Sequence, residues 1–406
     1  MSIGVTSEEP SATPSGDNGS EGLSKVETEV YDRQIRLWGM EAQNKLRAAN
    51  VLLCGLSGLG AEISKNLMLC GIRSLTLTDE KNVTEEDVDS NFLLENNSIG
   101  KNRARASSQK ARALNPMVKL EVLEASVSSV SPEFVSNFTL VVLCDQKYSD
   151  VVFWNEKCRQ LKIGFIACSV FGWMGFSFFD FNDHYFLRQA WGALLTPKKV
   201  LMIIRINFSA AEKKQDAVCD GDGGGTSSAP EAIDVDAENV LEKKKYQYPS
   251  IEEAFNVDWS KKQLVRKSRR VIPCSYFPLK AMLRAQKEGK LCADDEKNLK
   301  ILTELWTEEV TSLHSVIISG NHPPDLRTAP TLQVLIANHE IEKQTVQAEN
   351  FDYFFGPQLS PVCAIVGGLA GQEAIKAMSE NGRPLRNIFI YSALDSTGTM
   401  CMFPPP

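Results

Sequence analysis

The alternation of apolar and polar residues is most informative between Asn50 and Asp79. A short apolar run, Val51 to Cys54, has the composition of a strand and enters a glycine-rich turn. The apolar positions after that turn have helical spacing, at Ile63, Leu67 and Cys70. Gly71 is placed to end the helix, and a second alternating run leads to Asp79. Strand, glycine turn, helix, strand and acidic residue in this order predict the start of a nucleotide-binding α/β unit.

Strand and helix patterns continue to alternate after Asp79. Helices are predicted over 103–114 and 151–161, and strands over 118–123, 140–144, 163–169 and 176–181. The run from 140 to 144 is apolar throughout, as in a buried parallel strand. This alternation predicts an α/β fold with a Rossmann-like, doubly wound, mostly parallel sheet and flanking helices.

Composition divides the chain into five parts. A tail rich in Ser, Gly, Pro and Glu, residues 1–25, is predicted to be disordered. The α/β domain occupies 26–185 and is completed by 331–406. Between these parts we expect a flexible acidic, glycine-rich loop at 186–246 and a helical insertion at 247–330.

The C-terminal part carries its own pattern. A helix is predicted over 331–348, and a second over 361–378 that is apolar nearly all round and therefore belongs inside the protein. Closing strands are predicted at 388–391 and 400–403. Whether the apolar piece 191–208 forms a strand is left open.

Residues 27–47 near the N-terminus are predicted to be helical. The apolar stripe of this helix consists of Tyr31, Ile35 and Trp38. Arg33 and Arg36 project from roughly the opposite side, which composition alone assigns to a solvated helix face. Gly39 is placed to end or bend the helix.

The glycine turn has the chemistry of a phosphate site, with one departure. Gly55, Gly58 and Gly60 let backbone approach phosphates, and the following helix presents free N–H groups. Asp79, about twenty residues on, is placed to accept hydrogen bonds from ribose hydroxyls. Ser57 replaces the second glycine of the dinucleotide pattern and crowds the place of a pyrophosphate. Nucleotide binding and a merely tight strand-to-helix turn both remain open here.

Net charge and the placement of cysteines argue against several classes of protein. The net charge of −7 argues against a nucleic-acid partner, and no apolar stretch reaches the roughly 20 residues that span a membrane. The ten cysteines are scattered, several lie in apolar runs, and none forms a C-x-x-C pair. We therefore expect no signal peptide, no structural zinc site and a location in cytosol or nucleus. The basic residues within 261–270 form either a solvated helix face or a nuclear import signal.

Several motifs occur together in one order. They are YDRQIRLWG at 31–39, GLSGLG at 55–60, NFLLENNSIGKNRA at 91–104, LNPMV at 114–118, VFGWMGFSF at 170–178 and PVCAIVGGLAGQEAIKA at 361–377. In company they resemble the ubiquitin-activating enzyme family, with its ThiF-like adenylation fold, and within it the small subunits of SUMO-activating enzymes. The resemblance covers roughly 30–185 and 246–402.

This resemblance implies a heterodimer of two related adenylation domains. In such enzymes the large catalytic subunit binds ATP and Mg, adenylates the SUMO C-terminus and then forms a thioester through its own cysteine. The small subunit is a supporting partner. A nuclear and cytoplasmic location is implied as well.

The residues at the family's ATP positions indicate which half this chain resembles. Where active halves carry N-x-N-R, this chain has Asp87, Asp89 and Ser90. Two carboxylates would repel a triphosphate. The family's phosphate-binding lysine falls at Arg103.

The family's metal-binding aspartate falls at Asp145, but no arginine follows it until Arg159. The catalytic cysteine stretch of the large subunit is absent as well. The resemblance thus implies the inactive half, with no metal and no nucleotide of its own. The turn formed by Gly55, Ser57, Gly58 and Gly60, together with Asp79, would be vestigial.

The resemblance gives Arg33 a role in trans. In this family an arginine of the Y-D-R-Q-I helix reaches the partner's ATP site and contacts the γ-phosphate, a task that suits an always-charged planar donor. Arg36 is expected to be structural.

Other functions were weighed against this one. The nearest alternatives are the small subunit for another ubiquitin-like protein and a non-catalytic interaction scaffold. A homodimeric sulfur-carrier-activating enzyme would need the missing Asn–Arg set and C-x-x-C pairs. A nicotinamide-dependent dehydrogenase is disfavoured by Ser57 and by the lack of a catalytic His or Tyr–Lys pair.

Overall fold

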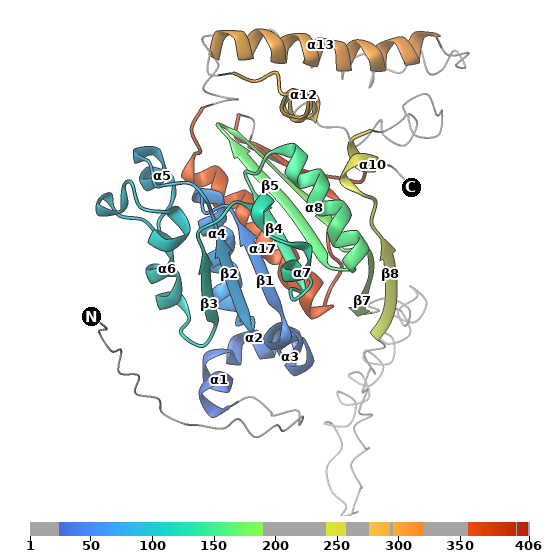
Figure 1. The fold of residues 1–406 in the computed structure, drawn as a ribbon. Helices are drawn as coiled ribbons and strands as arrows, with labels where there is room; N and C mark the ends of the chain where they lie inside the picture. The colour runs from blue at the N-terminus through green and yellow to red at the C-terminus, as the bar shows by residue number, and fades with distance from the viewer. Residues whose placement is uncertain are drawn as a thin grey trace, which may run out of the picture.

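Figure 1 shows the fold in a computed structural model, which describes residues 24–189, 241–256, 276–292, 295–319, 356–394 and 396–404. Its main sheet consists of β1 (Asn50–Cys54), β2 (Ser74–Thr78), β3 (Lys119–Leu123), β4 (Leu140–Cys144), β5 (Gly164–Phe171), β6 (Met174–Asp180), β9 (Ile388–Ser392) and β10 (Thr397–Cys401). These eight strands lie in the order β10-β9-β6-β5-β4-β1-β2-β3.

Strand direction divides this sheet into two regions. The five strands β3, β2, β1, β4 and β5 run parallel, and β6, β9 and β10 extend the sheet with antiparallel pairs. In the parallel region Leu53 of β1 lies opposite Leu77 of β2 and Val142 of β4. The predicted Rossmann-like, mostly parallel sheet is confirmed.

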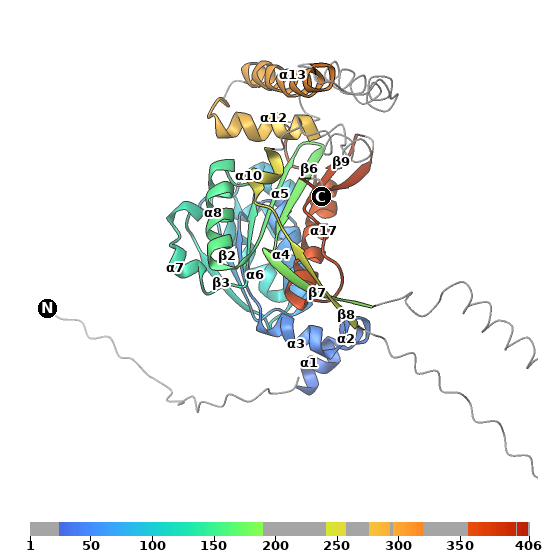
Figure 2. The same ribbon diagram turned by 90° about the vertical axis from the view of Figure 1, so that its right-hand side faces the viewer.

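Helices cover both faces of the sheet. They are α1 (Lys25–Val30), α2 (Asp32–Trp38), α3 (Met40–Ala48), α4 (Gly58–Cys70), α5 (Glu85–Ser90), α6 (Arg103–Leu114), α7 (Pro132–Val135), α8 (Tyr148–Leu161), α10 (Ile251–Phe255), α12 (Tyr276–Lys287), α13 (Asp295–Ser319) and α17 (Ser360–Ser379). Figure 2 shows α8 and α17 on opposite sides of the sheet. In both views α1, α2 and α3 lie at one end of the sheet, and α12 and α13 lie beyond the other.

Two apolar cores follow from the strand alternation. Val51 and Leu53 of β1 pack into the core shared with α4, α6 and α17. Leu52 and Cys54 point to the opposite face and pack into the core shared with α8 and α12. Trp154 of α8 fills the second core and is only 1% exposed. Burial on both faces explains why β1 and β4 are apolar at nearly every position.

The predicted element types agree with the structure, with shifts at element ends. The helix predicted over 361–378 is α17, and strand 140–144 is β4. The closing strand predicted at 400–403 begins earlier, at Thr397, where pairing with Ser392 of β9 starts. No described helix is long and apolar enough to cross a membrane.

The predicted helix over 27–47 is divided into α1, α2 and α3. Tyr31, with ψ of 9°, ends α1, and Gly39, with φ of +88°, ends α2. The second break was anticipated from the glycine. The first was not, because it depends on a tertiary contact of the Tyr31 ring rather than on local propensity.

The segment 186–246, predicted to be a flexible loop, is partly strand. β7 (Asp183–Gln189) and β8 (Leu241–Gln247) pair antiparallel, with Phe186 opposite Lys244. Aromatic residues favour the strand, and burial alternates along it, with His184 and Phe186 buried and Tyr185 exposed. The expectation was therefore wrong at both edges of the segment. The insertion over 247–330 is helical where it is described, in α10, α12 and α13. The expectations for 1–23, 191–208, 261–270 and 331–348 concern residues outside the described ranges.

Tyr31 fixes the N-terminal helices to the sheet domain. It is 2% exposed, and its hydroxyl accepts a hydrogen bond from Asn115 Nδ2 at 2.8 Å. Its ring lies against Gly71, which ends α4 in the left-handed region with φ of +76°. A Cβ at Gly71 would come within 2.5 Å of the ring. The absence of a side chain at Gly71 is therefore what allows Tyr31 to dock.

We predict that Gly71→Ala lowers the free energy of unfolding by about 2–4 kcal/mol, since left-handed backbone and overpacking both carry a cost. Gly289→Ala is the matched control, because Gly289 is also left-handed (φ of +63°) but has open space around it. It should cost only about 1 kcal/mol. Urea unfolding of both variants checks this, and equal losses would show that the Tyr31 contact contributes nothing.

Candidate functional site

The glycine turn between β1 and α4 is shaped by contacts within the protein. Gly55 has φ of +96°, and a Cβ there would lie 2.1 Å from the carbonyl oxygen of Cys144. A Cβ at Gly60 would lie 1.9 Å from the carbonyl oxygen of Gly55, and one at Gly58 would lie 2.7 Å from that of Ser90. These three glycines are required by backbone packing, whether or not a phosphate ever approaches.

Asp79 at the end of β2 is the predicted ribose-binding residue. It is 6% exposed, and both of its carboxylate oxygens are engaged. Oδ2 accepts hydrogen bonds from the Leu56 backbone N–H at 2.7 Å and from Arg103 Nε at 3.0 Å. Oδ1 accepts one from the Lys81 N–H at 2.9 Å. Asp79 therefore holds the glycine turn itself, with both oxygens already hydrogen-bonded.

Arg103 begins α6 and bridges two buried carboxylates. Besides Asp79, its Nη1 donates to Asp87 Oδ1 at 3.0 Å, and Arg103 and Asp87 are each 8% exposed. Burial lowers the pKa of the guanidinium, but the two aspartates more than offset this, and its pKa is raised. One buried cation thus neutralises two buried anions at the position where the family carries a phosphate-binding lysine. Sequence reasoning found Arg103 and Asp87 but missed their mutual contact.

The segment before α6 is docked directly onto the turn. Asn91, fully buried, donates through Nδ2 to the carbonyl oxygen of Leu56 at 2.8 Å. Ser90, at the position of the family's arginine, presses its backbone against Gly58 and donates its hydroxyl to the Glu86 carbonyl. Asp89 is exposed on α5. These residues do not fit ATP in the chain's own turn, because the groups that would bind it hold each other.

Asp145, which the resemblance places at the family's metal-binding position, also accepts hydrogen bonds from within the protein. Its Oδ2 accepts hydrogen bonds from Ser57 Oγ at 2.5 Å and Gln358 Nε2 at 2.7 Å, and its Oδ1 accepts one from the Val170 N–H at 3.0 Å. Burial raises the pKa of this carboxyl despite those donors. The described ranges contain no group of three or more His, Cys, Asp or Glu side chains arranged to hold a metal ion.

Arg159, the nearest arginine downstream of Asp145, serves another carboxylate. Its Nη1 donates to Asp180 Oδ2 at 2.8 Å and to the carbonyl oxygen of Tyr248 at 3.0 Å. It therefore supports the end of β6 rather than the nucleotide turn, as its spacing in the sequence suggested.

Buried cysteines make poor nucleophiles in this fold. Seven of the eight described cysteines are buried, and Cys292 alone among those eight is exposed. Burial raises the pKa of the Cys158 and Cys168 thiols to about 12. These thiols are packed as apolar residues.

Arg33 projects from α2 into solvent. Its side chain is exposed and makes no ion pair or hydrogen bond with any other described residue. Arg36, by contrast, pairs with Asp32 within the same helix, Nε to Oδ2, at 3.0 Å. The two arginines thus differ in their contacts, since of the two only Arg36 has an ion pair in the part of the chain that the structure describes.

The position of α2 keeps Arg33 away from the chain's own turn. Gln34, its neighbour, donates through Nε2 to the carbonyl oxygen of Leu69 at 3.0 Å, and Tyr31 packs on Gly71. Both contacts are at the C-terminal end of α4, whereas the glycine turn is at its N-terminal end. A helix of 13 residues is about 20 Å long. Arg33 therefore lies at the opposite end of the domain from Asp79 and Arg103.

Apolar side chains are exposed around Arg33. Val30 is 57% exposed, Leu37 80%, Met40 44% and Leu69 45%. We call these four residues the α2 surface. Sequence reasoning missed it, although Val30 and Leu37 lie off the buried stripe and so signalled exposure. An arginine without a partner beside exposed apolar side chains has the composition of a protein interface.

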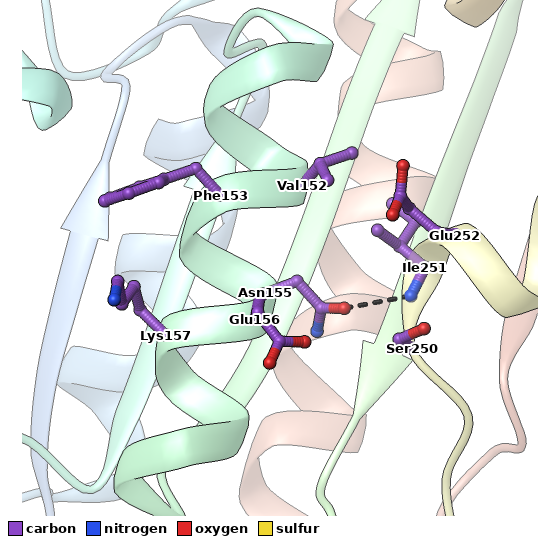
Figure 3. A pocket seen from close by; sticks show the side chains of 8 residues that line it. All are labelled: Val152, Phe153, Asn155, Glu156, Lys157, Ser250, Ile251 and Glu252. Carbon is purple, nitrogen blue, oxygen red and sulfur yellow. Dashed lines mark hydrogen bonds between the residues drawn. The ribbon is translucent and has the colours of Figure 1, made fainter.

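A shallow groove of about 350 Å³ lies between α8 and α10 (Figure 3). Asn155 crosses it, accepting a hydrogen bond from the Ile251 N–H at 2.9 Å. The two glutamates of the groove are already engaged, Glu156 by Gln160 and Glu252 by Lys287. We interpret this groove as the structural contact by which α10 attaches to α8.

Comparison with known proteins agrees with the fold. The sequence pattern of the ThiF family matches residues 31–405, and the chain belongs to this family. SUMO-activating enzyme subunit aos-1 of Caenorhabditis elegans is 38% identical over 389 residues, covering 94% of this chain and 99% of that protein. SUMO-activating enzyme subunit 1 of Homo sapiens is 31% identical over 387 residues, covering 94% and 97%. The resemblance to the small subunits of SUMO-activating enzymes is confirmed.

We predict that Arg103→Met lowers the free energy of unfolding by about 3–5 kcal/mol, because it leaves Asp79 and Asp87 buried without their cation. Arg105→Met, two residues along α6, removes an exposed pair with Glu124 and should cost less than about 1 kcal/mol. Chemical denaturation of both variants measures the difference. Similar losses for the two would mean that the buried network does not stabilise the turn.

Proposed function

We propose that this chain is the regulatory subunit of a heterodimeric SUMO-activating enzyme. In the complex, the carboxylate of the SUMO C-terminus attacks the α-phosphate of ATP and releases pyrophosphate. The thiolate of a cysteine of the large subunit then attacks the acyl carbon of this adenylate, which forms the thioester and releases AMP. ATP and Mg are bound by that large subunit, and the complex acts in the nucleus and cytoplasm. This chain alone is the inactive half.

The observation that carries this proposal is the buried pairing of Arg103 with Asp79 and Asp87 in the chain's own turn. A triphosphate at this turn would have to displace Arg103 from two carboxylates and then lie beside them. A subunit that cannot bind a nucleotide at its own glycine turn needs a partner subunit that binds one. The relatives, named as subunits of SUMO-activating enzymes, support the choice of that partner.

Arg33 supplies the second part of the proposal. It is exposed, unpaired within the described chain, about one helix length from its own turn, and flanked by the α2 surface. We infer that the α2 surface contacts the large subunit and that Arg33 enters the partner's ATP site. There the guanidinium would stabilise charge on the γ-phosphate. Tyr31, Gln34 and Trp38 position the helix but touch no substrate.

Two alternative functions each differ from the proposed one in a single respect. The chain could serve another ubiquitin-like protein, which the names of its relatives disfavour. In a scaffold without catalytic contribution, the α2 surface would contact the partner, but replacing Arg33 would not change the activity of the complex. Activity of Arg33 variants in the complex separates the scaffold from the proposal.

We predict that Arg33→Ala, in the complex with the large subunit, slows SUMO-dependent ATP–pyrophosphate exchange on the order of 100-fold. The pair should still co-elute in gel filtration, because the α2 surface is unchanged. Arg36→Ala is the matched control, since Arg36 is exposed on the same helix and pairs only with Asp32. It should leave exchange near the wild-type rate.

The isolated chain should show no exchange, and adding the large subunit should restore it. Robust exchange by the isolated chain would overturn the assignment as the inactive half. Equal rates for the Arg33→Ala and wild-type complexes would favour the scaffold.

A further inference from the structure

A cavity of about 460 Å³ opens beyond the end of α17. Three cations and one carboxylate line it, Lys376, Arg383, Arg386 and Glu373, together with Leu385 and Met400. Met400 is 56% exposed, so part of the rim is apolar. In a chain with a net charge of −7 this concentration of positive charge is unexpected.

Two of the cations are stacked on one aromatic ring. The guanidinium carbons of Arg383 and Arg386 lie 5.2 Å and 5.8 Å from the ring centroid of Tyr246 in β8. Each contact is a favourable cation–π interaction, but the shared ring also brings two like charges together. The cost of that repulsion falls when an anion binds between or beside them.

Neither arginine has an acidic partner among the described residues. The nearby Glu373 is 3% exposed and already engaged: Oε1 contacts Lys376 Nζ at 2.6 Å and Oε2 accepts the Leu385 N–H at 2.6 Å. The Nε of Arg386 is buried and has no acceptor within the described ranges. With no carboxylate partner in the described ranges, the charge of both guanidinium groups is left for an anion at the cavity to balance.

Several other arginines in the described ranges have acidic partners, although Arg33 and Arg73 do not. Six described arginines pair with carboxylates, namely Arg36, Arg47, Arg103, Arg105, Arg159 and Arg284. The pair at the end of α17 departs from that pattern while lining a cavity. The planar guanidinium group of each of these two arginines is suited to donate two hydrogen bonds to the two oxygens of a carboxylate.

We propose that this cavity, which we call the Arg383–Arg386 site, binds an acidic peptide segment of a partner protein. A glutamate or aspartate carboxylate would contact the two guanidinium groups, and an adjacent apolar side chain would pack on Leu385 and Met400. The site is distinct from the glycine turn and from the α2 surface, and it does not depend on the proposed enzymatic function. The apolar rim favours a peptide over a free anion, because phosphate alone would leave Met400 uncovered.

The test uses the full-length chain and a fluorescent eight-residue peptide of alternating glutamate and leucine. We expect saturable binding that weakens with rising salt, since exposed charge pairs are screened. Arg383→Gln combined with Arg386→Gln should weaken it at least about tenfold. Arg73→Gln is the matched control, because Arg73 is exposed and has no side-chain ion pair with any described residue. It should not change the affinity.

Three results would overturn the proposal. They are no binding of the glutamate peptide, equal binding of a peptide with glutamine in place of glutamate, and equal loss in the Arg73→Gln control. Binding of a phosphoserine peptide or inorganic phosphate without binding of the glutamate peptide would likewise assign the site to another ligand. If the double variant is unfolded by circular dichroism, Arg383→Gln alone decides, since that side chain is exposed.

Discussion

One buried cation between two buried carboxylates governs how this chain uses its fold. Arg103 contacts Asp79 and Asp87 beside the glycine turn between β1 and α4. Each carboxylate alone would be costly to bury, and so would the guanidinium. Together they are satisfied, and they hold the glycine turn, β2 and α5 in one arrangement. The proposed role as the inactive half rests on this pairing, which occupies the groups beside the turn while the Rossmann-like geometry is kept.

Other polar groups around the glycine turn are also hydrogen-bonded within the protein. Ser57 and Gln358 donate to Asp145, and Asn91 donates to the turn. Each is a polar group that an active half would direct toward a ligand, and each here completes a hydrogen bond inside the protein. Arg33, which is exposed and has no ion pair with any described residue, lies instead at the other end of α4, on a helix anchored by Tyr31. The proposal that Arg33 acts in the partner's site rests on this separation between the internally paired turn and the exposed arginine.

Much of this fold was predictable from sequence because its signals are local. The apolar runs of β1 and β4, the helical stripe of α4 and the helical character of α17 need only a few neighbouring residues to be recognised. The expectation that α17 is enclosed holds for one face only, since Ile365 is 42% exposed. The break at Tyr31 was not predictable, since it depends on a ring docking against Gly71, far along the chain. For the same reason the sequence identified Asp79, Asp87 and Arg103 as residues of interest without revealing that they bind one another. The β7–β8 pairing was missed because residues 190–240 separate the two strands, so no local pattern joins them.

The most direct test of this account is calorimetry of MgATP with the isolated full-length chain. Because Asp79, Asp87 and Arg103 satisfy one another, we expect no saturable heat of binding at millimolar nucleotide, and none after Arg33→Ala either. Saturable, stoichiometric binding of ATP to the chain alone would show that the turn opens to accept a nucleotide, and the account of a filled site would then be wrong.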